Sequence, residues 1–349
     1  MNPNLPHTLF LSRGLKATAW YRCALPALAL GCDWLAYGGE PPDLQVGYGR
    51  SQQELTVADL ERYDVIVVQQ PAGTGWLALI REWQRKGIVV LIDIDDYLRG
   101  VSKRTDHDFA EKYTKSRLEE YELCLRAADG VICSTAWLAQ RYRSLNAETY
   151  VCQNGIDLKR YAVTRPARDH VGVGWSGATG HKEAVLPWLR ELQGLMRERE
   201  DVHFISVGQG FANLFAQEFG RRALTVPFGA LEVYPSAMAL FDIALAPAGS
   251  NNFFRGKSDL RWLEASALGI PTIADPVVYP EIEHGVTGFH ASTPAELRSI
   301  LAELVADPQL RRTVGEAAKA DVSERRTFQA TSSQWVDVLQ AVGAAAAAA

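Results

Sequence analysis

Long apolar runs alternate with amphipathic segments along most of this chain. Residues 64–69 (DVIVVQ) and 87–92 (GIVVLI) are rich in β-branched residues and lack polar alternation, which is typical of strands buried on both faces. A segment with helical spacing of its apolar residues, 75–85, separates them. Buried strands joined by helices predict a doubly wound α/β domain with a parallel sheet. Such sheets bind ligands at the carboxyl ends of their strands.

The second half of the chain repeats this alternation. Strands are expected at 170–175, 202–207, 224–227, 242–246 and 271–275, with a helix at 183–197. A chain of 349 residues is long enough for two domains of ordinary size. We therefore place one α/β domain at 1–165 and a second at 166–326, followed by a helix at 327–343 and a low-complexity tail at 344–349.

The stretch 251–271 (NNFFRGKSDLRWLEASALGIP) carries the strongest candidate binding site. A polar loop with Gly256 is expected to lead into a helix of about three turns, which Gly269 and Pro271 end. The helix is apolar nearly all round, as is typical of a buried helix, and its polar side chains form one stripe: Lys257, Arg261 and Glu264. This stripe would face a cleft, or it would be a solvated stripe with an Arg261–Glu264 ion pair.

The start of that helix is also a candidate phosphate site. The first amides of a helix lack intrahelical partners, and Gly256 would let a ligand approach the amides near Ser258 closely. Glu264 lies about 10 Å further along the same face, at 1.5 Å per residue. A nucleotide could therefore lie along the helix, with phosphate at the amides and sugar hydroxyls at Glu264.

Two further turns join a strand to a helix through glycine and basic residues, which is phosphate-binding geometry. Arg13 and Gly14 follow the strand expected at 7–12, and Gly177, His181 and Lys182 follow the strand at 170–175. The helix after the first turn is expected at 20–30, where Pro26 indicates a kink or a later start. Its Arg22 would face either the cleft or the solvent.

Three carboxylates, Asp93, Asp95 and Asp96, follow the buried strand at 87–92. Three interpretations are open at this point: acceptor orientation or acid–base help in the cleft, helix capping, and a Mg²⁺ site. The loop after them contains His107, which would either line the acceptor side or have no role in the site.

Two motifs resemble a known family. Residues 281–289 (EIEHGVTGF) follow Glu264 and the helix end Gly269-Ile-Pro271, and residues 150–157 (YVCQNGID) place an Asn-Gly turn after a strand. This combination resembles family 4 of the GT-B glycosyltransferases. The resemblance implies two Rossmann-like domains that face a central cleft, with the helix at 327–343 crossing back over the first domain.

The resemblance also implies an activity and assigns residues to it. A sugar would pass from a nucleotide diphosphate sugar, with UDP as the expected nucleotide, with retention of anomeric configuration and without a metal. The expected roles are Glu264 for the ribose, Lys257 with His181 or Lys182 for the diphosphate, Phe228 and Gly229 near the base, and Arg22, Asp93 and Asp95 near the acceptor. Phe228 would otherwise be a core residue. Gly256 departs from the family, because it stands where the first of two glutamates is expected, so that Asn252 or Lys257 would contact the sugar instead.

Composition narrows the remaining classes. A net charge of −5, 47% hydrophobic residues and 22% charged residues are ordinary for a globular protein and give no global signal for nucleic acid. Five cysteines without CxxC spacing indicate reduced thiols and no zinc site, so we expect a cytoplasmic protein. The sequence shows no signal-peptide pattern and no run of membrane-spanning length.

The acceptor stays open between a glycan, a small molecule and a hydroxymethylated DNA base. The DNA alternative needs a basic groove, which Arg99, Lys103, Arg104, Lys112, Lys115 and Arg117 could supply. From another functional class, a non-catalytic nucleotide-sugar-binding protein would fit the missing glutamate.

Overall fold

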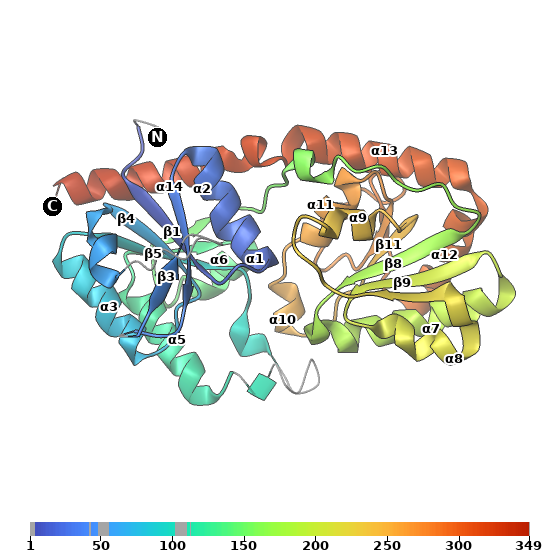
Figure 1. Ribbon diagram of the computed structural model, residues 1–349, viewed down its shortest axis with the longest axis horizontal. Coiled ribbons are helices and arrows are strands. Elements are labelled where there is room, and N and C mark those ends of the chain that lie inside the picture. Colours follow the sequence, from blue (N-terminus) through green and yellow to red (C-terminus); the bar gives the residue numbers. More distant parts are fainter. Residues whose placement is uncertain (1–3, 42, 48–55, 102–109, 112, 349) are drawn as a thin grey trace.

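The computed structural model describes the chain except for residues 1–3, 42, 48–55, 102–109, 112 and 349. The described residues form two α/β domains that lie next to each other along the long axis of the molecule (Figure 1). Each domain has its own sheet with helices on both faces. The predicted doubly wound α/β architecture is therefore confirmed.

The N-terminal domain contains a seven-stranded sheet in the order β3-β2-β1-β4-β5-β6-β7. Its strands are β1 (Thr8–Arg13), β2 (Asp33–Gly38), β3 (Gln45–Gly47), β4 (Val65–Gln69), β5 (Val89–Ile94), β6 (Gly130–Cys133) and β7 (Thr149–Val151). All neighbours pair in parallel except β3, an antiparallel edge strand. Its α-helices are α1 (Ala17–Ala19), α2 (Leu25–Leu30), α3 (Thr74–Arg85), α5 (Lys115–Ala127) and α6 (Ala136–Tyr142).

The C-terminal domain contains a six-stranded parallel sheet in the order β10-β9-β8-β11-β12-β13. Its strands are β8 (Val171–Gly177), β9 (Val202–Gly208), β10 (Ala223–Val226), β11 (Ile243–Ala246), β12 (Thr272–Ala274) and β13 (Phe289–His290). Its helices are α7 (Lys182–Glu198), α8 (Ala216–Phe219), α9 (Tyr234–Met238), α10 (Asn252–Arg255), α11 (Leu260–Ala267), α12 (Pro294–Ala306) and α13 (Pro308–Arg325).

Successive residues of the central strands enter different cores, as the period of two along a strand requires. In β4, Ile66 and Val68 pack toward α3 and α5, whereas Val65 and Val67 pack toward α2 and the last helix. Every residue of this strand is buried. This two-sided burial explains why the strand reads as one continuous apolar run.

The helix expected at 20–30 is divided by a π-helical turn. The structure has α1, then a π-helix at Trp20–Ala24, then α2 with Pro26 in its first turn. Proline is tolerated in a first turn because its missing N–H would have had no partner there. The wide π turn is the segment in which Tyr21 and Arg22 are buried, and π turns are frequent at functional sites.

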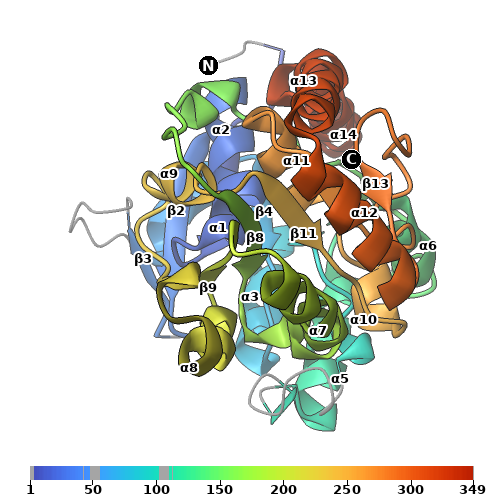
Figure 2. The same cartoon turned by 90° about the vertical axis from the view of Figure 1, so that its right-hand side faces the viewer.

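The last helix, α14 (Phe328–Ala348), runs from the C-terminal domain back over the N-terminal one (Figures 1 and 2). It packs on α2, and its Trp335 ring meets the Phe10 ring of β1 edge to face at 5.5 Å. Both chain ends therefore lie in the N-terminal domain (Figure 1).

Two segments connect the domains and lie side by side. Ile156 and Thr327 form a parallel bridge between them. The Asn-Gly turn before the first connection is tightly packed, since a Cβ on Gly155 would lie 2.6 Å from the Phe328 Cα. Beside it, the buried Arg326 guanidinium pairs with Asp259, with one N–O distance of 2.5 Å and another of 2.9 Å.

All five cysteines are free thiols. Among the described helices, none combines the length and the apolar character that crossing a membrane would require.

Candidate functional site

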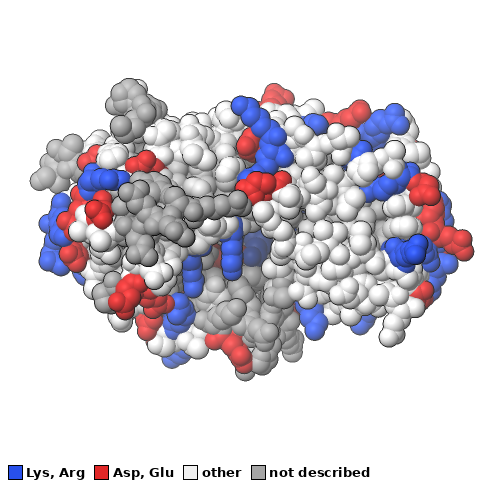
Figure 3. Space-filling model, in the orientation of Figure 1, with Lys and Arg blue, Asp and Glu red and all other residues white. Residues whose placement is uncertain are grey.

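The two domains meet at the carboxyl ends of their strands. Lys257 Nζ lies 2.5 Å from Asp96 Oδ1, which follows β5, and Asn154 donates a 2.8 Å hydrogen bond to Ser258. Basic side chains line the recess between the domains (Figure 3). This is the edge at which doubly wound sheets bind their ligands.

The predicted polar loop with Gly256 precedes the central helix at residues 256–259, but the residues before Gly256 form a short helix. Asn251 accepts hydrogen bonds from the Phe253 and Phe254 amides and so caps a short helix, α10. The Lys257 amide then donates to the Phe254 carbonyl at 2.9 Å, so it has no free N–H for phosphate. The following helix, α11, begins only at Leu260 and has eight residues, which is shorter than expected.

Gly256 is a point of contact between the domains. A Cβ at this position would lie 2.9 Å from the Tyr97 Cβ and 3.1 Å from Leu138 Cδ2, both in the N-terminal domain. Gly100 has the same property from the other side, because its Cβ would lie 2.4 Å from the Phe253 amide nitrogen. A glutamate at position 256, which the resemblance implied, would not fit this arrangement of the domains.

Three basic groups and one glycine gather at the start of α7. A Cβ on Gly177 would lie 2.7 Å from an Arg261 Nη atom, so the guanidinium lies against the backbone of the β8–α7 turn. The pKa of His181 is well below its usual value, because the ring is buried and because Arg261 and Lys257 are close. Its Nδ1 has no hydrogen-bond partner among the described residues. We call Gly177, His181, Lys257 and Arg261 the basic cluster.

Two predicted donor residues lie outside this cluster. Lys182 and Asn252 are exposed, each in the first turn of its helix. Of the two basic residues after β8, His181 therefore belongs to the basic cluster and Lys182 does not.

Glu264 is held by a network of tyrosines from both domains. Its carboxylate accepts a 2.8 Å hydrogen bond from Tyr21, and the Tyr234 hydroxyl lies 3.1 Å from its other oxygen. The Tyr161 hydroxyl lies 2.7 Å from that of Tyr21. Burial raises the pKa of Glu264, while the hydrogen bonds from Tyr21 and Tyr234 act in the opposite direction. The alternative of a solvated stripe with an Arg261–Glu264 ion pair is not supported, because this pair is not among the salt bridges of the described residues and Glu264 is buried.

Phe228 is an exposed aromatic ring at this edge, not a core residue. Its side chain is 54% exposed, and Gly229 beside it is exposed as well. A Cβ on Gly208 would lie 2.3 Å from the Phe228 ring, so the ring lies against the glycine that ends β9. A flat, exposed ring in this position can stack on a base.

Asp93 and Arg22 form a buried pair. Arg22 Nη2 lies 2.6 Å from Asp93 Oδ1, and its Nη1 donates to the Cys152 carbonyl at 2.5 Å and to Asn154 Oδ1 at 3.1 Å. Both side chains have at most 1% of their surface exposed. Burial raises the pKa of Asp93, and the guanidinium acts in the opposite direction.

Asp95 and Asp96 lie further out, at the interface. Asp95 accepts a 2.6 Å hydrogen bond from the side-chain amide of Gln70. Burial, followed by the negative charge of Asp96, raises the pKa of Asp95 to about 7. Asp96 has Lys257 as its partner. Within the described part of the chain, no group of three or more His, Cys, Asp or Glu side chains is arranged to hold a metal ion.

Several predicted residues lie on the N-terminal side or cannot be placed. His107, Lys103, Arg104 and Lys112 lie outside the described residues. The other members of the predicted basic groove each face a carboxylate: Arg99 with Glu122, Lys115 with Glu119, and Arg117 with Glu40. Gly14 has a φ of 69° and donates its amide to Tyr37, which turns the chain after β1.

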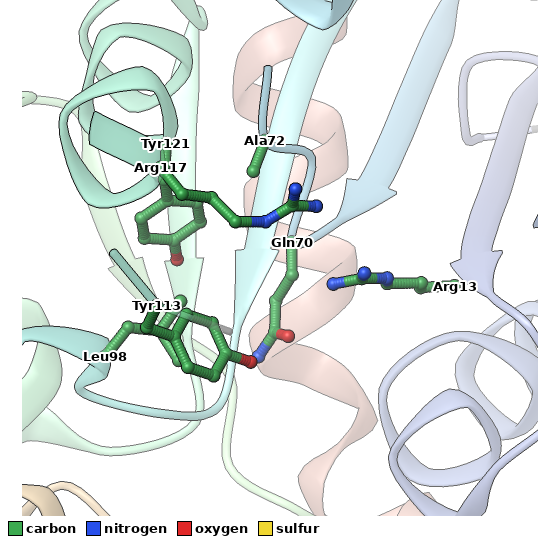
Figure 4. A pocket seen from close by; sticks show the side chains of 7 residues that line it. All are labelled: Arg13, Gln70, Ala72, Leu98, Tyr113, Arg117 and Tyr121. Carbon is green, nitrogen blue, oxygen red and sulfur yellow. The ribbon is translucent and has the colours of Figure 1, made fainter. Parts of the chain in front are cut away.

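Arg13 lines a small pocket of the N-terminal domain (Figure 4). The other lining residues are Gln70, Ala72, Leu98, Tyr113, Arg117 and Tyr121. Sequence reasoning missed Gln70 and the tyrosines of both sites. The position of Gln70, at the end of a buried strand and before Pro71, was the one signal that could have indicated it.

Comparisons with known proteins agree with this geometry. Residues 187–337 match the family model described as glycosyl transferase-like. HepE from Anabaena has a TM-score of 0.63 at 18% identity, over 96% of this chain and 99% of its own. Sucrose-phosphate synthase from Thermosynechococcus elongatus has a TM-score of 0.67 at 16% identity, over 97% and 100%. A glycosyltransferase from Rickettsia africae has a TM-score of 0.62 at 11% identity, over 97% and 98%.

At such low identities the likeness to solved structures shows the fold. The comparison with curated proteins finds no match. The family match confirms the expected enzyme class for the C-terminal domain, and the three structures confirm the expected fold. The chain carries a glycosyltransferase-like domain at residues 187–337 and has the GT-B fold of glycosyltransferases.

Proposed function

We propose that this protein transfers a sugar from a UDP-linked sugar to an acceptor hydroxyl, with retention of anomeric configuration and without a metal. The observation that carries this proposal is the basic cluster, whose Arg261 lies on the same helix, α11, as the buried carboxylate of Glu264. Anion-binding groups next to a carboxylate suit the diphosphate and the ribose of one nucleotide. HepE, which has the same fold, is known in complexes with UDP and with UDP-glucose, and this supports the choice of nucleotide.

The donor diphosphate would lie on the basic cluster. Arg261 offers a planar set of N–H donors that suits phosphate oxygens, and Lys257 offers a point charge. The uracil would stack on Phe228, and the ribose hydroxyls would donate to Glu264. As the bond from the anomeric carbon to the diphosphate oxygen breaks, Arg261 and Lys257 neutralise the charge that develops on the leaving group.

The acceptor would enter from the N-terminal side, at Asp95 and Asp96. The acceptor oxygen forms the new bond to the anomeric carbon on the face that the diphosphate leaves, and its proton passes to the departing phosphate oxygen. We assign Asp93 and Arg22 a positioning role, because they saturate each other and are buried away from solvent. They would hold the end of β5, and with it Asp95 and Asp96, at the domain interface.

The test is a calorimetric titration of the protein with UDP and UDP-glucose. Glu264→Gln keeps the shape of the side chain and removes its charge, so we expect a loss of at least tenfold in UDP affinity. Phe228→Ala should cost about tenfold, since stacking on an aromatic side chain contributes about 1–3 kcal/mol. Glu283→Gln, at an exposed glutamate of the same domain, is the matched control and should bind as the wild type does. Equal affinity in all four proteins would contradict the donor site.

Catalysis is separated from binding by a second measurement. Release of UDP from UDP-glucose, with or without an acceptor, would exclude a protein that only binds nucleotide sugars. Tight binding of UDP-glucose without release of UDP would favour the non-catalytic alternative. No observation favours a DNA acceptor, because each described member of the basic groove has a carboxylate partner.

A further inference from the structure

Two guanidinium groups line the pocket in Figure 4, and each has few hydrogen-bond acceptors around it among the described residues. Arg13 is the last residue of β1, at the carboxyl edge of the sheet, and its guanidinium forms no ion pair with any described residue. Among the described residues, the guanidinium of Arg117, on α5, has one hydrogen-bond partner, the exposed Glu40 at 2.9 Å. Guanidinium groups have N–H donors and no acceptor, and their planar shape suits carboxylate and phosphate oxygens.

A buried hydroxyl in the same pocket has at most one weak partner. Tyr121 is 2% exposed and lines the pocket. Its hydroxyl interacts with the neighbouring Tyr142 side chain, and no described residue meets it with full hydrogen-bonding geometry. A buried polar group without a partner costs free energy, so it is rare unless it serves a ligand or a water. This observation is independent of the two arginines and points to an oxygen-bearing ligand.

Gln70 connects this pocket to the carboxylates at the domain interface. Within the described chain it is the one residue other than glycine with a positive φ, at 46°. Residues with long side chains adopt this conformation rarely, and where they do the strain is often part of a functional site. Its backbone amide donates to the Asp93 carbonyl at 3.1 Å and its side chain to Asp95 at 2.6 Å. The strained backbone therefore holds one side chain between the pocket and Asp95.

The charge changes from positive to negative between the pocket and the domain interface. Tyr113, which also lines the pocket, interacts electrostatically with Asp95 and Asp96 and with Arg13 and Arg117. The pocket thus has a positive part at the arginines and a negative part toward the interface, where Lys257 of the other domain meets Asp96. A molecule with an anionic group at one end and a hydroxyl at the other would match both parts.

We propose that this pocket binds an anionic oxygen group of the acceptor, a phosphate or a carboxylate, through Arg13, Arg117 and Tyr121. The acceptor is then a phosphorylated or acidic molecule whose hydroxyl points toward Asp95. This inference rests on the proposed function and goes beyond it by naming the acceptor class. Binding at the arginines, away from the basic cluster, fixes the anionic end while the hydroxyl faces the donor.

The test uses inorganic phosphate and acetate as probes for the two sources of such a group. Each is titrated into the UDP-saturated protein at constant ionic strength, so that the basic cluster is occupied and screening is equal. We expect Arg13→Gln and Arg117→Gln each to weaken binding of the preferred anion at least tenfold. Arg81→Gln, at an exposed arginine of α3, is the matched control and should leave the affinity unchanged.

The outcomes separate this inference from the proposed function. Preference for phosphate indicates a phosphorylated acceptor and preference for acetate an acidic one, and either supports the pocket. Equal anion affinities in the wild type and in Arg13→Gln contradict the pocket, whether or not UDP binds. If UDP does not bind, the same anion titrations are made without it. If the anion affinity then depends on Arg13, the pocket is supported and the nucleotide site is contradicted. Arg13 is exposed, so Arg13→Gln should keep the melting temperature of the wild type in chloride, which verifies its fold.

Discussion

Tyr21 of the N-terminal domain donates a 2.8 Å hydrogen bond to Glu264 of the C-terminal domain. The carboxylate that we assign to the ribose is therefore already occupied from across the domain interface. A ribose hydroxyl that binds this oxygen of Glu264 competes with the phenol for it. Domain arrangement and nucleotide binding are coupled at this one contact, because moving the domains apart removes Tyr21 from Glu264.

Removing the Tyr21 hydroxyl should strengthen nucleotide binding. Tyr21→Phe frees one oxygen of Glu264 without changing the ring, and a net hydrogen bond is worth about 1 kcal/mol, so we expect about fivefold tighter UDP binding in a calorimetric titration. Tyr150→Phe is the matched control, because it also removes a phenol–carboxylate bond, 2.9 Å to Glu148, far from the site in β7. Weaker binding by Tyr21→Phe would show that the phenol assists the nucleotide instead.

Breaking the buried Arg22–Asp93 pair should unfold the protein more easily. Asp93→Asn leaves the guanidinium of Arg22 buried without its counter-charge, which typically costs about 3–5 kcal/mol of unfolding free energy. Urea denaturation measures this loss. Glu218→Gln, which breaks the exposed pair with Arg197, should leave the stability close to that of the wild type. An Asp93→Asn protein with wild-type stability and no activity would contradict the positioning role and indicate that Asp93 contacts the reacting groups.

Asp95 should make the protein less stable as the pH rises. Its pKa in the folded protein is about 7, whereas that of an unfolded aspartate is about 3.9. Between these values the folded state holds the proton and the unfolded state does not, so unfolding free energy falls as pH rises and the full cost is present above about pH 7. Asp95→Asn should be more stable than the wild type at pH 8 by about 2–4 kcal/mol, and equal to it near pH 4.

The control for this pH dependence has the opposite sign. The pKa of Asp201 is lowered, mainly by its hydrogen bond from Arg199, so its ionised form stabilises the folded state above the unfolded pKa. Asp201→Asn should therefore lose a little stability at pH 8. Unfolding curves of Asp95→Asn that run parallel to those of the wild type at every pH would contradict the assignment.

His181 should gain a proton when a diphosphate binds. Its imidazole is neutral because burial, Arg261 and Lys257 lower its pKa, and a diphosphate on the basic cluster would offset these positive charges. We expect its pKa, followed by NMR, to rise with UDP-glucose and not with uridine. Since binding then takes up a proton, the affinity for UDP-glucose should increase as the pH falls from 7 to about 5.5. His181→Gln should lack this increase, and an unchanged His181 titration with bound UDP-glucose would contradict the placement of the diphosphate.

The sequence sufficed for the architecture because the relevant signals are local. Runs such as DVIVVQ at 64–69 indicate a strand that is buried on both faces, and glycine and proline at 269 and 271 indicate where α11 ends. The start of α11 was missed because it depends on a distant partner. Asp259 is held by Arg326, 67 residues further along the chain, and α11 begins directly after it.

The candidate site was predictable only in part, for the same reason. Lys257, Arg261 and Glu264 share one segment, so their spacing showed them together. Tyr21 and Glu264 are 243 residues apart, and no spacing could join them. Gly256 was recognised as a departure from the family, but its close contact with Tyr97 is a property of how the domains meet.

The path of α14 has a consequence for the order of assembly. The N-terminal sheet is covered on one face by α2 and α14, and residues from β1, β4 and α14 share one core around Trp335. During synthesis that face of the first domain is covered by α2 but not by α14 while the whole second domain emerges from the ribosome. The domain that is made first is thus completed last, and a fragment that ends before Phe328 would expose Phe10 and its neighbours to water.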